Sequence, residues 1–119
     1  MKESIEGFLL SLEKISKSNH IRELKVIEKT KSILKARLHF SDDIFIQIYV
    51  NIKRPKKNYA LIINDIRIFG KDYIFGLWHL HPFESPQKHD DSEKVRKPIT
   101  IEEFVEEATF ILSEKLGMI

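Results

Sequence analysis

Residues 33–52 have the sequence ILKARLHFSDDIFIQIYVNI, and their periodicity points directly to a fold class. In the first half, the even positions from 34 to 40 are apolar and the odd positions are mostly basic. In residues 44–52, every second side chain is that of isoleucine or valine. This alternation predicts strands with one buried face, and Ser41-Asp42-Asp43 between them is typical of a turn. The stretch therefore predicts two neighbouring strands with a common apolar face.

Weaker alternation predicts further strands on both sides of this stretch. Asn64-Asp65 is typical of a two-residue hairpin turn, and prolines after position 81 end the last strand. Residues 53–58 are expected to form a loop. The further strands are predicted at residues 22–30, 59–63, 66–70 and 73–81.

Amphipathic helices are expected near both ends of the chain. Residues 3–18 place apolar side chains at the i, i+3, i+4 and i+7 spacing of a helix with one apolar face. A second helix begins at Thr100, which forms a capping box with Glu103, and Lys115 and Gly117 indicate its end. The connections between strands are too short for parallel crossovers, which favours a meander. We predict an α+β fold with two layers, in which an antiparallel sheet of five to six strands carries an N-terminal and a C-terminal helix on one face.

Length and composition narrow the class of protein. The 119 residues are enough for one domain, taken as residues 1–119. The chain has no cysteine, which excludes disulfides, thiolate zinc sites and a cysteine nucleophile and fits a reducing compartment. No apolar run approaches the ~20 residues of a membrane span, and a signal peptide is not evident, so we expect a cytoplasmic protein with no membrane partner. High Lys, Glu and Ile content resembles that of heat-adapted proteins.

The net charge of +2 conceals a strong asymmetry. Residues 22–57 contain ten Lys or Arg against four Asp or Glu, whereas residues 98–119 contain five Glu against one Lys. A basic centre beside an acidic segment is typical of a surface that faces a polyanion. The same asymmetry would arise without any partner if the strands and the helix simply use different charged residues on their solvated surfaces.

The strand phases predict which residues lie on the sheet face opposite the core. Interleaved cations and aromatic rings on such a face are the chemistry that binds single-stranded nucleic acid, although antiparallel sheets commonly keep one solvated polar face. The predicted face carries Lys25, Lys29, Lys35, Arg37, His39, Phe45, Gln47, Tyr49, Arg67, Phe69, His79 and His81. The candidate nucleic-acid contacts are Lys35, Arg37, Phe45 and Tyr49 on strands and Lys53, Arg54, Lys56 and Lys57 in the loop.

Three of the five histidines, His79, His81 and His89, fall within eleven residues. Histidine exchanges protons near neutral pH and also binds metals and anions. The pair at 79 and 81 would point to the same face of a strand, where it could act as acid and base on RNA with Arg37 or Arg67 at the phosphate. Together with His89, the pair could instead hold zinc, nickel, manganese or iron. A purely structural role for all three is the third reading.

Four motifs within residues 59–111 are found together: an Arg-x-Phe strand, an aspartate–aromatic pair, a His-x-His-Pro stretch and a helix with Glu-Glu-Phe. With them the chain resembles the TumE-like toxins of prokaryotic toxin–antitoxin pairs over about half its length. Such toxins are thought to act on RNA and to be neutralised by an antitoxin protein. The resemblance implies RNA and an antitoxin as partners, and it implies a functional set of Arg67, Asp72, His79 and His81.

The leading hypothesis is a toxin-like RNA-binding protein that cleaves RNA without metal or other cofactor. A non-catalytic module that binds nucleic acid or protein is the second hypothesis, and a histidine-ligated metalloprotein is the third. Isoleucine-rich strand edges could also pair two copies of the chain into a homodimer. No phosphate-binding glycine loop, nucleophile elbow or glycosidase carboxylate pair is evident in the sequence.

Overall fold

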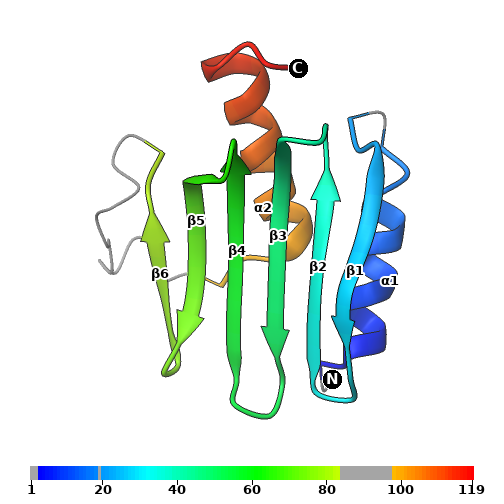
Figure 1. Ribbon diagram of the computed structural model, residues 1–119. Coiled ribbons are helices and arrows are strands. Elements are labelled where there is room, and N and C mark those ends of the chain that lie inside the picture. Colours follow the sequence, from blue (N-terminus) through cyan, green and yellow to red (C-terminus); the bar gives the residue numbers. More distant parts are fainter. Residues whose placement is uncertain (1–2, 19, 84–97) are drawn as a thin grey trace.

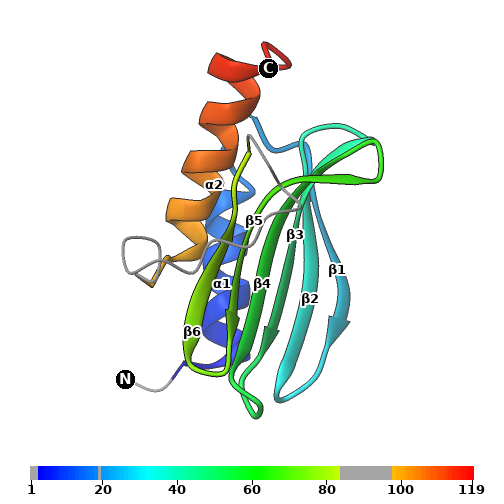
Figure 2. The ribbon, with the colours of Figure 1, turned by 90° about the vertical axis from the view of Figure 1, so that its left-hand side faces the viewer.

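The computed structural model describes residues 3–18, 20–83 and 98–119 and confirms the predicted α+β class. Six strands form one antiparallel meander, in which each strand pairs with the next along the chain. Helices α1 (Ile5–Ile15) and α2 (Ile101–Phe110) both lie against one face of this sheet (Figures 1 and 2). We call the other face the open face. The strands are β1 (Glu23–Lys29), β2 (Ile33–His39), β3 (Ile44–Asn51), β4 (Lys56–Ile63), β5 (Ile66–Ile74) and β6 (Leu77–His81).

The core lies between the sheet and the helices, as the alternation in residues 33–52 predicts. Phe104 of α2 stacks on Phe69 of β5 with ring centroids 5.1 Å apart, and Trp78 of β6 is also buried there. Burial of each such side chain contributes about 1.5–3 kcal/mol. The central strands supply the fully buried side chains Leu34, Leu38, Ile46, Ile48 and Val50.

Polar caps begin both helices. The hydroxyl of Ser4 accepts a hydrogen bond from the N–H of Gly7 at 3.0 Å. The capping box of α2 is confirmed, because Thr100 and Glu103 each accept from the backbone N–H of the other at 3.0–3.1 Å. After Phe110 the helix continues as a π-helical turn, η2 (Ile111–Lys115). No helix in the described part of the chain is long and apolar enough to cross a membrane.

Two tight hairpins bound strand β5. Asn64 and Asp65 have φ of 49° and 66°, as the predicted two-residue turn requires. The second turn lies at Phe75-Gly76, with φ of 54° and 78°, so the predicted boundary between strands 66–70 and 73–81 is wrong. Strand β5 continues through Gly70 to Ile74, because the chain reverses only at Phe75 and Gly76, which adopt positive φ.

Bulges in two strands change which face a side chain occupies, since one extra residue reverses the alternation. The first bulge is in β5: Leu61 of β4 pairs with Phe69 of β5, but the next residue of β4, Ile62, pairs with Arg67. The alternation predicts Phe69 on the open face, and this prediction is wrong, because the bulge turns Phe69 into the core. A second irregularity in β1 turns Lys29 towards α1, where it lies 2.9 Å from Glu6.

The segment predicted as a loop over residues 53–58 is partly strand. Strand β4 begins at Lys56, so Lys57 and Tyr59 point to the helix side and Asn58 to the open face. Only the turn around Lys53 and Arg54 remains as a basic connection.

The sheet is not flat. Figure 2 shows the β2–β3 and β4–β5 connections bending away from the helices, so that this end of the sheet curves over the open face. His39 and Phe45 are paired at this end. Both are largely buried, at 5% and 8% exposure, although they lie on the open face.

Candidate functional site

A buried carboxylate is the centre of the candidate site on the open face. Asp72 of β5 is 7% exposed. Its Oδ1 accepts a hydrogen bond from the Nδ2 of Asn58 on β4, and its Oδ2 lies 3.0 Å from the Nε2 of His81 on β6. Because a carboxylate only accepts hydrogen bonds, the proton in the second contact is on the imidazole Nε2. Asp72 thus fixes the orientation of the His81 ring from one side.

Arg67 lies against the same imidazole. Its Nη2 is 3.3 Å from the Nδ1 and 3.4 Å from the Nε2 of His81. The side chain runs past Gly70, where an added Cβ would come within 3.4 Å of the Arg67 Cδ and 3.1 Å of the Tyr59 carbonyl oxygen. Gly70 therefore leaves the space in which the guanidinium and the imidazole meet.

His79 occupies the next position of the open face on β6 and pairs directly with Asp72 across the ladder. Residues two apart on a strand have Cα atoms roughly 6.6 Å apart and point to the same side. His79 and His81 therefore lie beside one another, as predicted. Trp78, which precedes His79, and Leu80, which lies between the two histidines, face the core side. We call Arg67, Asp72, His79 and His81 the histidine cluster.

A second polar cluster lies further along the open face. The Nε of Arg37 donates to the Oε1 of Gln47 at 3.3 Å, and its guanidinium lies 4.8 Å from the ring centroid of Phe45. Arg37 and His81 lie in one cross-strand row but on β2 and β6, so four strand spacings, roughly 19 Å, separate them. Arg37 therefore cannot contact the same phosphate as His81, contrary to the prediction that Arg37 could stabilise the phosphate on which the histidines act.

The remaining candidate contacts divide between the two faces of the sheet. Lys35 and Tyr49 pair on the open face and are half-buried, so their positions agree with the prediction. Phe45 is covered by Arg37 and His39 and does not offer a free ring face. Lys53, Arg54 and Lys56 are exposed, whereas Lys57 lies on the opposite face, 2.6 Å from Glu3.

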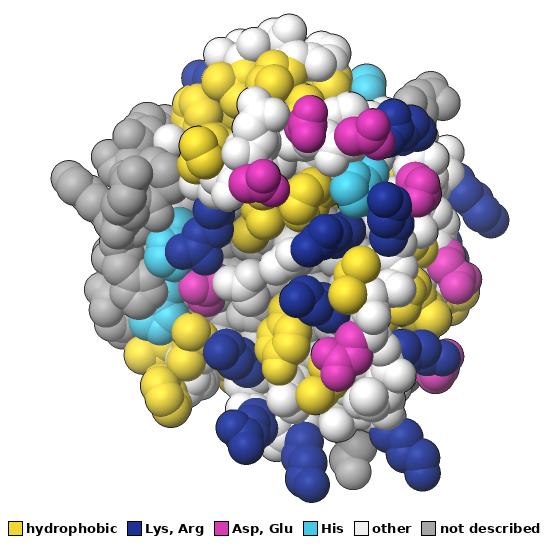
Figure 3. Space-filling view, in the orientation of Figure 1, with side chains coloured by type: hydrophobic (Ala, Val, Ile, Leu, Met, Phe, Trp, Pro, Cys, Tyr) yellow, Lys and Arg dark blue, Asp and Glu magenta, His cyan; other side chains and the backbone are white. Residues whose placement is uncertain are grey.

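Cationic side chains are spread over the middle and lower parts of the open face, and carboxylates lie along its upper part (Figure 3). Figure 3 shows Lys and Arg side chains across the middle and lower end of the sheet and histidines gathered at its left edge, over β5 and β6. His39 belongs to the buried end of the face, with its Nδ1 2.9 Å from the carbonyl oxygen of Ser41. The histidine cluster therefore lies at the edge of a cationic surface.

The predicted metal site involves residues inside and outside the described part of the chain. Among residues 3–18, 20–83 and 98–119, no group of three or more His, Asp or Glu side chains is arranged to hold a metal ion. His89, which would be the third ligand under the metalloprotein hypothesis, lies outside the described residues.

The sequence prediction missed Asn58 and Gly70. Counting outward from the Asn64-Asp65 turn without a bulge would place Asn58 opposite Lys71, whereas the bulge in β5 shifts its partner to Asp72. A polar residue flanked by Lys57 and Tyr59 in an alternating segment was the only signal for Asn58. Gly70 in mid-strand is a signal for close approach of other groups.

No family model, curated protein or solved structure matches this chain. The chemistry of the site must therefore be argued from its geometry. An imidazole oriented by a buried carboxylate, a second imidazole beside it and a guanidinium in contact are groups that can transfer protons and stabilise negative charge at one centre.

Proposed function

We propose that this protein binds single-stranded RNA on its open face and cleaves it with the histidine cluster, without a metal ion. The observation that carries the proposal is the contact of His81 with both Asp72, at 3.0 Å, and Arg67, at 3.3 Å. The basic surface beside the cluster would bind the phosphates, and Tyr49 would offer a ring on which a base can stack.

The proposed reaction is transfer of a phosphodiester to the neighbouring 2′-hydroxyl. His79 takes the proton of the 2′-hydroxyl, whose oxygen attacks phosphorus, and the bond from phosphorus to the 5′-oxygen breaks. His81 donates a proton to that oxygen, giving a 2′,3′-cyclic phosphate and a free 5′-hydroxyl. Arg67 lies where it can move from the His81 ring onto the phosphate and stabilise the charge that develops there.

Asp72 positions His81 in this scheme. Its carboxylate orients the ring and offsets the positive charge that the ring has when protonated. Asn58 in turn holds the other carboxylate oxygen. The two imidazoles on neighbouring open-face positions of β6 would lie on either side of one phosphate, as separate acid and base groups require.

The toxin-like identity is part of the same proposal. The resemblance to TumE-like toxins places Arg67, Asp72, His79 and His81 in the functional set, and these four residues meet in one cluster. An antitoxin protein would then be the natural partner, and the absence of cysteine fits a cytoplasmic location. A homodimer formed through strand edges stays a prediction, with β1 and β6 as the two edges.

The test is cleavage of a labelled single-stranded RNA in the presence of a chelator. Wild-type protein should cut the RNA and leave a matched DNA strand intact, because DNA lacks the attacking hydroxyl. His81→Ala and His79→Ala should each lower the cleavage rate by at least about 100-fold. The proposal fails if wild-type protein does not cut RNA, or if both variants cut at the wild-type rate.

A binding module without catalysis is the alternative, and the Arg37–Gln47–Phe45 cluster favours it because it lies roughly 19 Å from His81. In that case RNA would bind in a salt-dependent manner and remain intact. Both His→Ala variants would then bind as wild type does, while Arg37→Ala would bind more weakly.

A further inference from the structure

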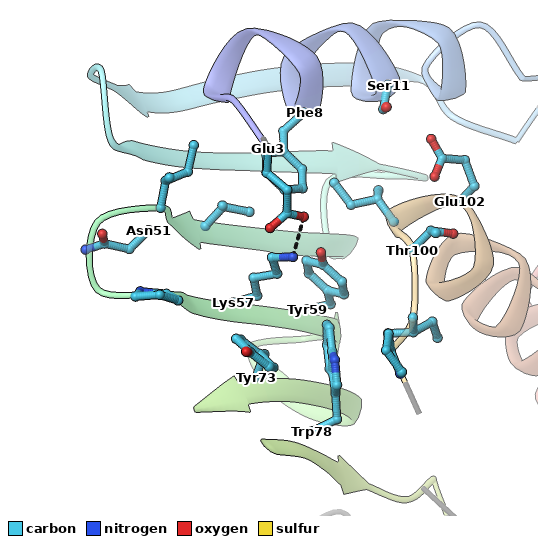
Figure 4. Close-up of a pocket in the computed structure, with 16 residues that line it drawn as sticks. Glu3, Phe8, Ser11, Asn51, Lys57, Tyr59, Tyr73, Trp78, Thr100 and Glu102 are labelled. Carbon is cyan, nitrogen blue, oxygen red and sulfur yellow. Dashed lines mark hydrogen bonds and ion pairs between the residues drawn. The ribbon is translucent and has the colours of Figure 1, made fainter. Parts of the chain in front are cut away.

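A pocket of about 740 Å³ lies on the helix side of the sheet, opposite the histidine cluster. Its walls come from α1, from β3 to β6 and from the start of α2 (Figure 4). Ligand pockets in proteins typically have volumes of roughly 300–1,000 Å³, with mainly apolar walls and a few polar groups that orient the ligand. The volume of this pocket is within that range.

Among the polar groups on the wall of this pocket is an amine surrounded by aromatic rings. The Lys57 Nζ lies 5.3 Å from the ring centroid of Phe8, 5.8 Å from that of Tyr73 and 5.9 Å from that of Trp78. The Lys57 side chain is only 16% exposed. A largely buried cation needs a negative partner, and the rings supply only part of that stabilisation.

The present partner of Lys57 is a carboxylate from the N-terminal end of the chain. The Oε2 of Glu3 lies 2.6 Å from the Lys57 Nζ, and the Glu3 side chain is 56% exposed. Figure 4 shows this carboxylate reaching the amine from above, with Tyr59 beside the amine and Tyr73 below it. Glu3 thus occupies the anion position of the pocket without filling its apolar part.

Tyr59 provides a second polar group on the same wall. Burial, followed by the negative charges of Glu3 and Glu102, raises the pKa of Tyr59 above its ordinary value. The hydroxyl therefore stays protonated at all physiological pH values and can donate a hydrogen bond.

We propose that this pocket binds a small amphipathic carboxylate, an organic acid with an apolar or aromatic tail. The acid group replaces Glu3 on Lys57, and the tail packs against the rings of Phe8, Tyr73 and Trp78. This site is independent of RNA cleavage, because the sheet separates it from the histidine cluster.

The probe for the test is 4-phenylbutyrate, with 4-phenylbutanamide as its neutral counterpart. Trp78 is the only tryptophan in the chain, so its fluorescence reports on the pocket directly. Phenylbutyrate should change this fluorescence saturably and bind in calorimetry. The amide should bind at least about 10-fold more weakly, because its neutral oxygen forms a weaker hydrogen bond with the Lys57 ammonium than a carboxylate does.

Variants separate a binding site from a purely structural ion pair. Lys57→Met keeps an unbranched side chain against the rings and should weaken phenylbutyrate binding at least about 10-fold. Glu3→Gln should strengthen it about two- to five-fold, because a half-exposed competitor is removed. Lys31→Met, the same change at an exposed turn, should bind as wild type does. The proposal is overturned if wild-type protein does not bind phenylbutyrate, if the amide binds equally well, or if Glu3→Gln binds no better than wild type.

Discussion

Substitution of Asp72 tests the hydrogen-bond network of the histidine cluster through stability alone, without any assumption about RNA. Asp72→Ala removes the acceptor of both the Asn58 amide and the His81 Nε2. Asp72→Asn keeps the shape, and its amide can pair with Asn58 if the latter rotates by half a turn, while its oxygen accepts from His81. The two variants therefore differ in how many donors they leave unsatisfied.

The structure gives the expected magnitudes. A buried donor left without an acceptor costs about 1–3 kcal/mol, and two would cost about 2–6 kcal/mol. The side chains of His81 and Asp72 are 12% and 10% exposed, so water can reach part of the site and the lower half of the range applies. We expect Asp72→Ala to lower the free energy of unfolding by about 2–4 kcal/mol, and Asp72→Asn by about 1 kcal/mol.

The assay is urea denaturation followed by circular dichroism and by Trp78 fluorescence. Coincident transitions and equal slopes for the three proteins would justify comparing free energies. Asn58→Ala alone should lower the free energy of unfolding less than Asp72→Ala does, because Asp72 then loses one hydrogen-bond donor but keeps its hydrogen bond with His81. If Asp72→Ala unfolds at the same urea concentration as wild type, or if Asp72→Asn is the less stable variant, the network described here is wrong.

Three further predictions concern other parts of the molecule. Phe75→Asn should raise the free energy of unfolding by about 0.5–1 kcal/mol in thermal or urea denaturation, because Phe75 has φ of 54° and is 97% exposed, and asparagine tolerates positive φ better; a loss of stability would indicate that the ring packs against something. Hydrogen bonds from the Thr100 backbone and side chain lower the pKa of Glu103, so its contribution is present above the ordinary glutamate pKa and lost as pH falls through the lowered value; Glu103→Gln should weaken this pH dependence in acid titrations followed by circular dichroism, and an unchanged profile would contradict it. Arg37→Met should reduce the salt dependence of RNA binding, measured by fluorescence anisotropy, by about 0.7 in log–log slope, whereas Lys57→Met on the opposite face should leave that slope unchanged; equal effects would contradict the assignment of faces.

Periodicity was sufficient for most of the fold. The alternation in residues 33–52 predicts two central strands and their buried row, and the capping box at Thr100 predicts the start of α2. These signals are local, because a side chain's face depends only on its neighbours along a regular element. The same logic placed His79 and His81 together on the open face.

The errors lie where one residue breaks the regular alternation. The bulge near Ile68 sends Phe69 into the core while Arg67 stays on the open face, and the same bulge brings Asn58 opposite Asp72. Nothing in the sequence marks that bulge, since its position depends on how the whole hairpin packs. The sequence does not indicate the second turn at Phe75, because a large aromatic residue is rarely found at positive φ.

The products of RNA cleavage show whether the histidine cluster is catalytic. The measurement compares wild type and Asp72→Asn for the rate at which a single-stranded RNA yields a 2′,3′-cyclic phosphate in the presence of a chelator, alongside their affinities for an uncleavable 2′-deoxy strand. We predict a cyclic phosphate from wild type, a rate at least about 100-fold lower for Asp72→Asn, and equal affinities. If wild-type protein forms no cyclic phosphate, or if Asp72→Asn forms it at the wild-type rate, the histidine cluster does not cleave RNA in the way proposed.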